Sequence, residues 1–66
     1  MYEIYAKLRD ERGLTDYQVA KQTGIAGQTL YSWKNGAYEP KADKLLKIAE
    51  LLGVDIQVFL AAKKAQ

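Results

Sequence analysis

The sequence has no cysteine and no histidine, and its 66 residues include a single proline. Without cysteine, neither a disulfide nor a thiolate metal site can stabilise the chain. Without histidine, the most common general base and metal ligand is missing. No apolar stretch approaches the roughly 20 residues of a membrane span, and the start shows no signal-peptide pattern. We therefore expect one small cytoplasmic domain, residues 1–66, with no metal and no cofactor.

The charge balance is close to neutral, with 10 basic and 8 acidic residues and a net charge of +2. This is low for a nucleic-acid-binding protein, so any basic surface has to come from local clustering. Catalysis is not indicated either. The sequence has no glycine-rich phosphate loop of the form GxxxxGKS or GxxxxGKT, and neither Thr29 nor Ser32 has a base beside it. The composition favours a binding domain over an enzyme.

Apolar periodicity and the glycine positions predict an all-α domain. We expect five helices, over residues 2–11, 16–23, 27–35, 41–52 and a last one capped by Asp55 that continues to about Lys64. The fourth helix has an inward stripe formed by Leu45, Ile48, Ala49 and Leu52. In the last helix Val58 and Phe59 suit the core, while Ile56 and Leu60 are left near the surface. Residues 63–66 are expected to fray.

Residues 15–36, which read TDYQVAKQTGIAGQTLYSWKNG, are the most informative stretch. Thr15 and Gln18 have the spacing of a capping box, which marks the start of a helix. Gly24 stands where the chain must turn, with a positive φ that glycine adopts cheaply. An apolar series then follows at Ile25, Leu30 and Trp33, which leaves these residues outward: Gly27, Gln28, Tyr31, Ser32 and Asn35. Two crossed helices, one with an exposed polar face, are the layout of a helix-turn-helix.

At these positions the sequence resembles the lambda-repressor-like, or Cro/C1-type (XRE-family), helix-turn-helix proteins. The matching residues inside the two-helix unit are Ala20, Gly24, Leu30 and Trp33. Outside the unit they are Arg9, Gly13-Leu14-Thr15, Asn35-Gly36, Pro40, Leu45, Ile48-Ala49 and Leu52-Gly53-Val54. The resemblance covers about residues 2–60. It implies a compact five-helix fold whose third helix enters the major groove of duplex DNA.

The resemblance places base contacts near the start of the third helix, where Gln28 falls. The amide of Gln28 suits adenine N6 and N7, although an ordinary solvated residue is the alternative. Gly27 has no side chain to offer a base edge, but it allows close approach of the helix or room for a thymine methyl. The phase of Trp33 makes it a core residue rather than a stacking one. The expected base-contacting residues are Gly27, Gln28, Tyr31 and Ser32.

Two residues at helix starts depart from the family pattern. Ala26 replaces the usual serine or threonine cap, which costs about 1 kcal/mol of helix stability. The uncapped N–H groups either face a phosphate or have no role. Asp16 stands where the family often has a glutamine that contacts phosphate. DNA would repel a carboxylate there, although the carboxylate favours the N-terminus of its own helix.

Arg9 and Lys34 form another departure, because the family commonly pairs an arginine with a glutamate at these two places. We therefore expect Arg9 to turn to Asp10, Glu50 or a DNA phosphate, with its positive charge otherwise free. A rim of phosphate contacts is expected around the third helix, and each lysine in it is also explicable as a solvated residue. The candidates are Arg9, Lys21, Thr29, Lys34, Asn35, Gly36, Lys41 and Lys44.

These features predict a sequence-specific duplex-DNA-binding regulator of phage or prokaryotic type, acting as a repressor and as a weak homodimer. The resemblance implies that the C-terminal end makes the dimer contact, with Ile56 and Leu60 as candidates; a partly exposed surface helix is the alternative. One rival reading is an antitoxin, which uses the same fold to bind DNA and a second surface to bind a toxin. The other is a protein-interaction module without DNA binding. No membrane association is expected.

Overall fold

Residues 1–64 are described in this computed structural model, with side chains through residue 62. They form five α-helices: α1 (Tyr2–Glu11), α2 (Asp16–Thr23), α3 (Gly27–Lys34), α4 (Ala42–Leu52) and α5 (Gln57–Lys64). The predicted all-α class and element order are confirmed. None of these helices is long and apolar enough to cross a membrane.

Some helix ends differ from the prediction by one residue. Asn35 and Lys41 cap α3 and α4 rather than belonging to them. The carboxylate of Asp55 accepts a hydrogen bond from the N–H of Gln57 (2.9 Å), which confirms its capping role at α5. α5 continues through residue 64, and the fraying of residues 63–66 stays a prediction. Residues 65–66 of the predicted frayed tail lie outside the described residues.

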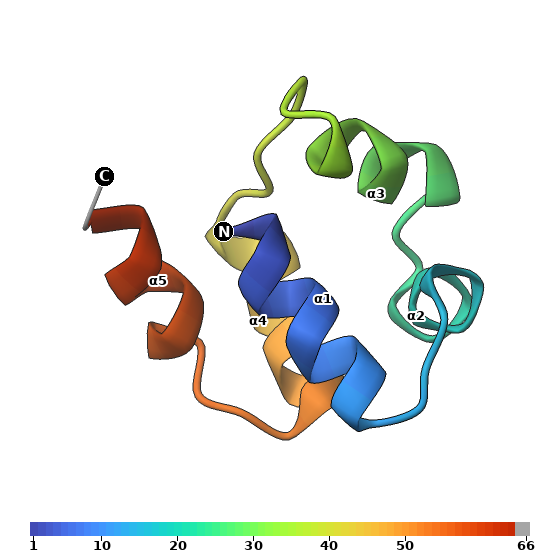
Figure 1. Cartoon of the computed structure of the whole chain (residues 1–66), viewed down its shortest axis with the longest axis horizontal. Helices are drawn as coiled ribbons and strands as arrows, with labels where there is room; N and C mark the ends of the chain where they lie inside the picture. The colour runs from blue at the N-terminus through green and yellow to red at the C-terminus, as the bar shows by residue number, and fades with distance from the viewer. Residues whose placement is uncertain (65–66) are drawn as a thin grey trace.

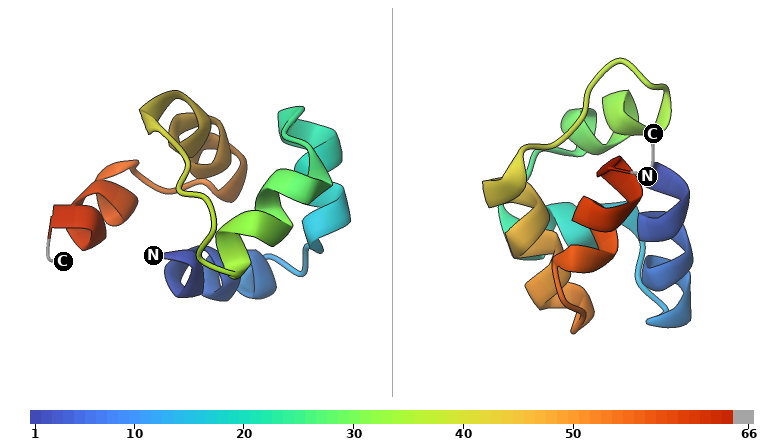
Figure 2. Two further views of the ribbon diagram at one scale, coloured as in Figure 1. Left: turned by 90° about the horizontal axis from the view of Figure 1, so that it is seen from above. Right: turned by 90° about the vertical axis from the view of Figure 1, so that its left-hand side faces the viewer.

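The helices lie in three groups across the molecule. Figures 1 and 2 show α5 on one side, α1 and α4 in the middle, and the pair of α2 and α3 on the other side. α2 packs against both α3 and α4. The core lies between these groups, and its buried side chains are Tyr5, Val19, Ile25, Leu30, Trp33, Leu45, Ile48, Ala49, Leu52 and Phe59. The inward stripe of α4 and the apolar face of α3 are as predicted.

The inward face of α5 differs from the prediction. Phe59 is fully buried, but Val58 is 38% exposed, so its predicted place in the core is wrong. Ile56 and Leu60 are half-buried against the core rather than left on the surface. Successive residues of a helix are rotated by about 100°, so a helix that turns Phe59 inward brings residues 56 and 60 toward one side of it. Val58 is then rotated toward the other side, which faces solvent.

The turn between α2 and α3 depends on glycine at residue 24. Gly24 has φ of 78°, in the left-handed region, and its N–H donates to the carbonyl of Ala20 (2.9 Å). A side chain is disfavoured in that region because its Cβ approaches the carbonyl oxygen that follows. The predicted positive φ is confirmed, and it sets the direction in which the chain leaves α2 for α3.

We predict that Gly24→Ala lowers the free energy of unfolding by about 1–2 kcal/mol, because alanine must adopt the left-handed conformation. Denaturant unfolding followed by circular dichroism measures the change. Gly27→Ala is the matched control, since Gly27 has no positive φ and a Cβ there meets no described atom within 4 Å. Equal destabilisation by both substitutions would contradict the backbone explanation.

Candidate functional site

The start of α2 is fixed by the predicted capping box. The N–H of Gln18 donates to Thr15 Oγ1 (3.2 Å), and the N–H of Thr15 donates to Gln18 Oε1 (2.9 Å). The N–H groups of Thr15 and Gln18 thus both have hydrogen-bond partners within the chain. α3 starts differently: Ala26 occupies the cap position and makes no side-chain hydrogen bond there, as predicted.

α3 has one face buried in the core and one face exposed to solvent. Leu30 and Trp33 are buried and hold the helix on the core. The other face is turned to solvent, and α3 lies at the edge of the helical assembly (Figure 1). Gly27, Gln28 and Tyr31 are exposed on this face, whereas Ser32 is half-buried. The predicted base-contacting residues therefore share one helix, and three of them are exposed to solvent.

Arg9 is not free, which corrects the expectation that its charge would be available to DNA. Its Nη1 lies 2.7 Å from Asp16 Oδ1, and its Nη2 lies 2.9 Å from Asp10 Oδ1. Asp10 was among the predicted partners, but Asp16 was not. Nη1 also donates to the hydroxyl of Tyr2 (3.2 Å). Arg9 thus replaces the family's partner with a carboxylate from the start of α2.

Asp16 is the centre of this polar cluster, which also contains Arg9, Tyr2 and Tyr5. The hydroxyl of Tyr5 donates to Asp16 Oδ1 (2.6 Å), and that of Tyr2 donates to Oδ2 (3.3 Å). Burial alone would raise the pKa of Asp16, but the hydrogen bonds from Tyr5 and Arg9 outweigh it and hold the pKa below its usual value. The carboxylate that was expected to repel DNA is therefore paired with a cation inside the protein.

The same two tyrosines connect this cluster to α3 through aromatic packing. The ring centroid of Trp33 lies 5.0 Å from that of Tyr5 and 5.4 Å from that of Tyr2. Phe59 of α5 also packs against Trp33, with the two ring centroids 6.5 Å apart. Burial, followed by the bond to Asp16, raises the pKa of the Tyr5 hydroxyl, so this group remains a donor. Tyr5 therefore bonds α2 with its hydroxyl and packs on α3 with its ring.

Tyr2 and Tyr5 are not among the residues predicted for the site. A signal was present, because residues 2, 5 and 9 fall on one face of a helix at spacings of three and four. What the sequence does not specify is the angle at which the chain turns between α1 and α2. That angle decides whether the face meets Asp16 or another acidic residue.

The charge around α3 is more favourable to an anion than the net charge suggests. Residues 17–38 contain two lysines, Lys21 and Lys34, and no aspartate or glutamate. Both lysines are exposed, as is Lys41, while Lys44 is half-buried. The nearest acidic residue on the N-terminal side, Asp16, is paired with Arg9. The helix-turn-helix surface is therefore cationic although the whole chain is nearly neutral.

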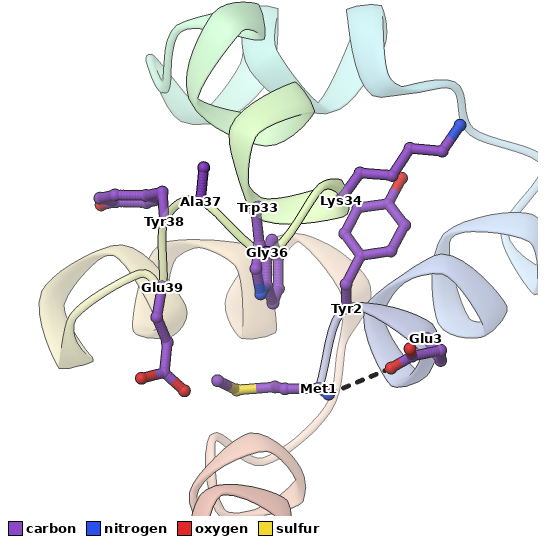
Figure 3. A pocket seen from close by; sticks show the side chains of 9 residues that line it. All are labelled: Met1, Tyr2, Glu3, Trp33, Lys34, Gly36, Ala37, Tyr38 and Glu39. Atoms are coloured by element: carbon purple, nitrogen blue, oxygen red, sulfur yellow. Dashed lines mark hydrogen bonds and ion pairs between the residues drawn. The ribbon is translucent and has the colours of Figure 1, made fainter.

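A shallow hollow of about 440 Å³ lies beside the C-terminal end of α3. Figure 3 shows Lys34 extended past the hydroxyl of Tyr2, away from Glu39. Among the residues whose side chains are described, no carboxylate forms an ion pair with Lys34. The predicted free charge of Lys34 is thus consistent with its surroundings, in contrast to that of Arg9. The remaining candidates, Asn35 and Gly36, are exposed in the same region, and Thr29 is half-buried.

Comparison with known proteins agrees with this geometry. Residues 6–59 match the model of the helix-turn-helix family. The chain is 38% identical over 50 residues to an uncharacterized HTH-type transcriptional regulator, y4dJ, of Sinorhizobium fredii; the match covers 76% of this chain and 65% of the relative. It is 35% identical over 46 residues to an uncharacterized HTH-type transcriptional regulator of Haemophilus influenzae, with 70% of this chain and 19% of the relative covered. The chain thus spans about a fifth to two thirds of these relatives. No solved structure matches it.

The polar cluster predicts acid sensitivity. Because the pKa of Asp16 is lower in the folded protein than in the unfolded chain, its stabilising contribution is complete above about pH 4 and is lost as pH falls through the folded value. Asp16→Asn should lower the free energy of unfolding at pH 7 by about 1–2 kcal/mol, a range that allows for the partial exposure of the carboxylate. Thermal unfolding between pH 7 and pH 2 measures both effects.

Asp43→Asn is the control for this experiment, because Asp43 also lies in the first turn of a helix but forms no ion pair with a described side chain. It should change stability by less than Asp16→Asn and leave the acid response close to that of the parent. Identical acid profiles for the parent and Asp16→Asn would refute the assignment.

Proposed function

This chain belongs to the helix-turn-helix family, and from that premise we propose that it binds duplex DNA sequence-specifically as a transcriptional regulator, with α3 in the major groove. We further propose that it represses transcription as a dimer. The observation that carries the proposal is the outward face of α3. That face is polar and exposed, it lies in a segment without carboxylates, and its opposite face is fixed to the core.

The dimensions of α3 suit a groove. A helix with its side chains is about 10–12 Å across, and the major groove of B-DNA is about 12 Å wide. The residues at the start of α3 are small or extended, so the helix can approach the base edges at that end. Gln28 supplies an amide for adenine, and the hydroxyls of Tyr31 and Ser32 supply further donors and acceptors.

Phosphate contacts are proposed for the exposed and half-buried cations and donors around α3. Lys21, Lys34, Lys41 and Lys44 supply charge, and the backbone around Asn35 and Gly36 supplies N–H groups. Thr29 is proposed as a hydroxyl donor at the groove edge. The pairing of Arg9 with Asp16 favours an internal role for Arg9, in which it cancels a carboxylate beside the DNA surface. Arg9 then supports binding without touching a phosphate.

Dimerisation is proposed through α5. Ile56 and Leu60 pack partly on the core, and the exposed Val58 adds apolar surface beside them. In a two-fold dimer the recognition helices would read half-sites about one helical turn apart. Sedimentation of the protein with a two-half-site duplex and with a single half-site measures the stoichiometry directly.

The rival functions differ in what they require. A protein-interaction module was favoured by the low net charge and by Asp16, but the ion pair to Arg9 removes the second reason. An antitoxin needs a second surface and a toxin that remains bound through purification. Co-purification of a stoichiometric partner from the native host would favour that function over a regulator acting alone.

Specific binding should show a strong dependence on salt. With about 4–6 phosphate contacts per subunit, log affinity should fall steeply and linearly with log salt concentration, because each neutralised phosphate releases a counterion. Fluorescence anisotropy of an enriched duplex measures the slope. If selection from a random duplex pool at about 50 mM salt enriches no sequence, the proposed function fails.

Gln28 and Lys34 should contribute in different ways. Gln28→Ala should cost about 1–3 kcal/mol on the best site and relax the preference at one base pair, with little change in thermal stability. Lys34→Gln should weaken binding to all duplexes alike and make the salt slope shallower by about one counterion. Lys47→Gln is the control, since Lys47 lines a hollow between α2 and α4 with Glu50. A uniform loss on every sequence for Gln28→Ala would show that Gln28 positions the helix rather than reads a base.

A further inference from the structure

We propose that this surface reads its half-site mainly through A·T base pairs. Gln28 would donate and accept hydrogen bonds with adenine. Thymine methyl groups would pack against the ring of Tyr31 and against the small residues Ala26 and Gly27 at the start of α3. This inference rests on the proposed function and specifies its DNA target. It follows from the base-reading side chains that the exposed face of α3 contains and from those that it lacks.

Readers of guanine and cytosine are missing from the part of α3 that meets bases. Guanine is most often read by arginine or lysine, and cytosine by a carboxylate. α3 has the sequence GQTLYSWK, with no arginine and no acidic residue. Its one cation, Lys34, lies in the last turn, whereas recognition helices contact base edges mainly with their N-terminal residues. The long polar side chain in the first turn is Gln28, whose amide matches adenine.

Neither arginine of the chain lies on α3. Arg9 is held by Asp16 and Asp10. The guanidinium of Arg12 lies where a Cβ on Gly53 would be, at the C-terminal ends of α1 and α4. Figure 1 shows these ends at the opposite side of the molecule from α3. Neither arginine can therefore supply a guanine contact to a groove that holds α3.

Gly27 gives independent support, because nothing in the described part of the chain requires glycine there. Its φ is not positive, and among the described residues a Cβ would meet no atom within 4 Å. Glycine also disfavours a helix relative to alanine. The absent side chain is useful if the start of α3 approaches another molecule closely. Beside it lie the methyl of Ala26 and, one turn on, the ring of Tyr31, which is 60% exposed.

The major groove contains an apolar group that can pack against the apolar groups on the exposed face of α3. The C5-methyl of thymine is the apolar group that base pairs present in the major groove. The small residues at the start of α3 leave room for such a methyl group, and the ring of Tyr31 can cover a second one. The combination of an adenine-reading amide with apolar neighbours is thus suited to A·T and T·A pairs rather than to G·C.

Selection from a random duplex pool with the full chain tests the base preference. We expect half-sites whose central pairs are A·T or T·A, and at least ten-fold weaker binding when the pair opposite Gln28 is changed to G·C. Enriched half-sites with central G·C pairs would overturn this inference while leaving the regulator function intact. Absence of any enrichment would instead overturn the function itself.

Two substitutions make the test sharper. Gln28→Arg should move the preferred base at its pair from adenine to guanine, because arginine is the common guanine reader. Gln22→Arg is the matched control, with the same change of charge on a glutamine that lines the hollow between α2 and α4. It should raise affinity for all duplexes without moving the preference. A preference that stays at adenine in Gln28→Arg overturns the assignment of that residue.

The methyl contacts are tested on the DNA. Replacing a central thymine by uracil removes its methyl, and we expect about a four-fold loss of affinity for each methyl that packs on the protein. Tyr31→Ala should abolish that loss at one thymine. No loss at any thymine would overturn the apolar part of the inference.

Close approach at Gly27 has its own test. Gly27→Ala should weaken binding at least ten-fold while the free energy of unfolding stays the same or rises. Ala42→Gly is the matched control, because Ala42 is the exposed first residue of α4 and its helix also lacks a side-chain cap. It should lower stability with little effect on binding. Unchanged affinity in Gly27→Ala would overturn the close approach.

Discussion

The hydrogen bond from Tyr5 to Asp16 determines how the rest of this small domain is arranged. The hydroxyl of Tyr5 fixes the first residue of α2, while its ring packs on Trp33 of α3. One fully buried side chain of α1 thus sets the position of both helices of the helix-turn-helix. A buried hydroxyl without a hydrogen-bond partner would lower the free energy of unfolding by about 1–3 kcal/mol. Asp16 therefore stabilises the core by accepting the hydrogen bond of Tyr5, and Tyr5 in turn stabilises the carboxylate of Asp16.

Arg9 makes this arrangement compatible with an anionic partner. Asp16 alone would place a negative charge at the start of α2, beside the proposed DNA surface. The guanidinium at 2.7 Å offsets that charge within the protein, and Asp10 holds the guanidinium from its other side. Where the family resemblance implies a glutamine that contacts phosphate, this chain has a carboxylate in an internal ion pair. The lysines around α3 supply the cationic surface instead.

Much of the fold could be predicted from the sequence, because the signals are local. The capping box at Thr15, the left-handed glycine at residue 24 and the apolar stripe of α4 each act within one or two helical turns. The pair of Arg9 and Asp16 could not be predicted, since it depends on the angle between α1 and α2. The inward side of α5 was wrong at Val58 for a similar reason: three neighbouring apolar residues leave the rotation of the helix undecided, and packing of Phe59 on Trp33 decides it.

The two faces of α3 also bear on how such a protein can change over evolutionary time. Leu30 and Trp33 hold the helix, whereas Gly27, Gln28 and Tyr31 are exposed on its other side. Substitutions at exposed positions usually alter stability by less than about 0.5 kcal/mol, and effects at separate sites are nearly additive. New target preferences can therefore arise by single changes on the outer face without bringing the fold near its stability threshold. A domain of this size can diverge into regulators of many operators while its core stays constant.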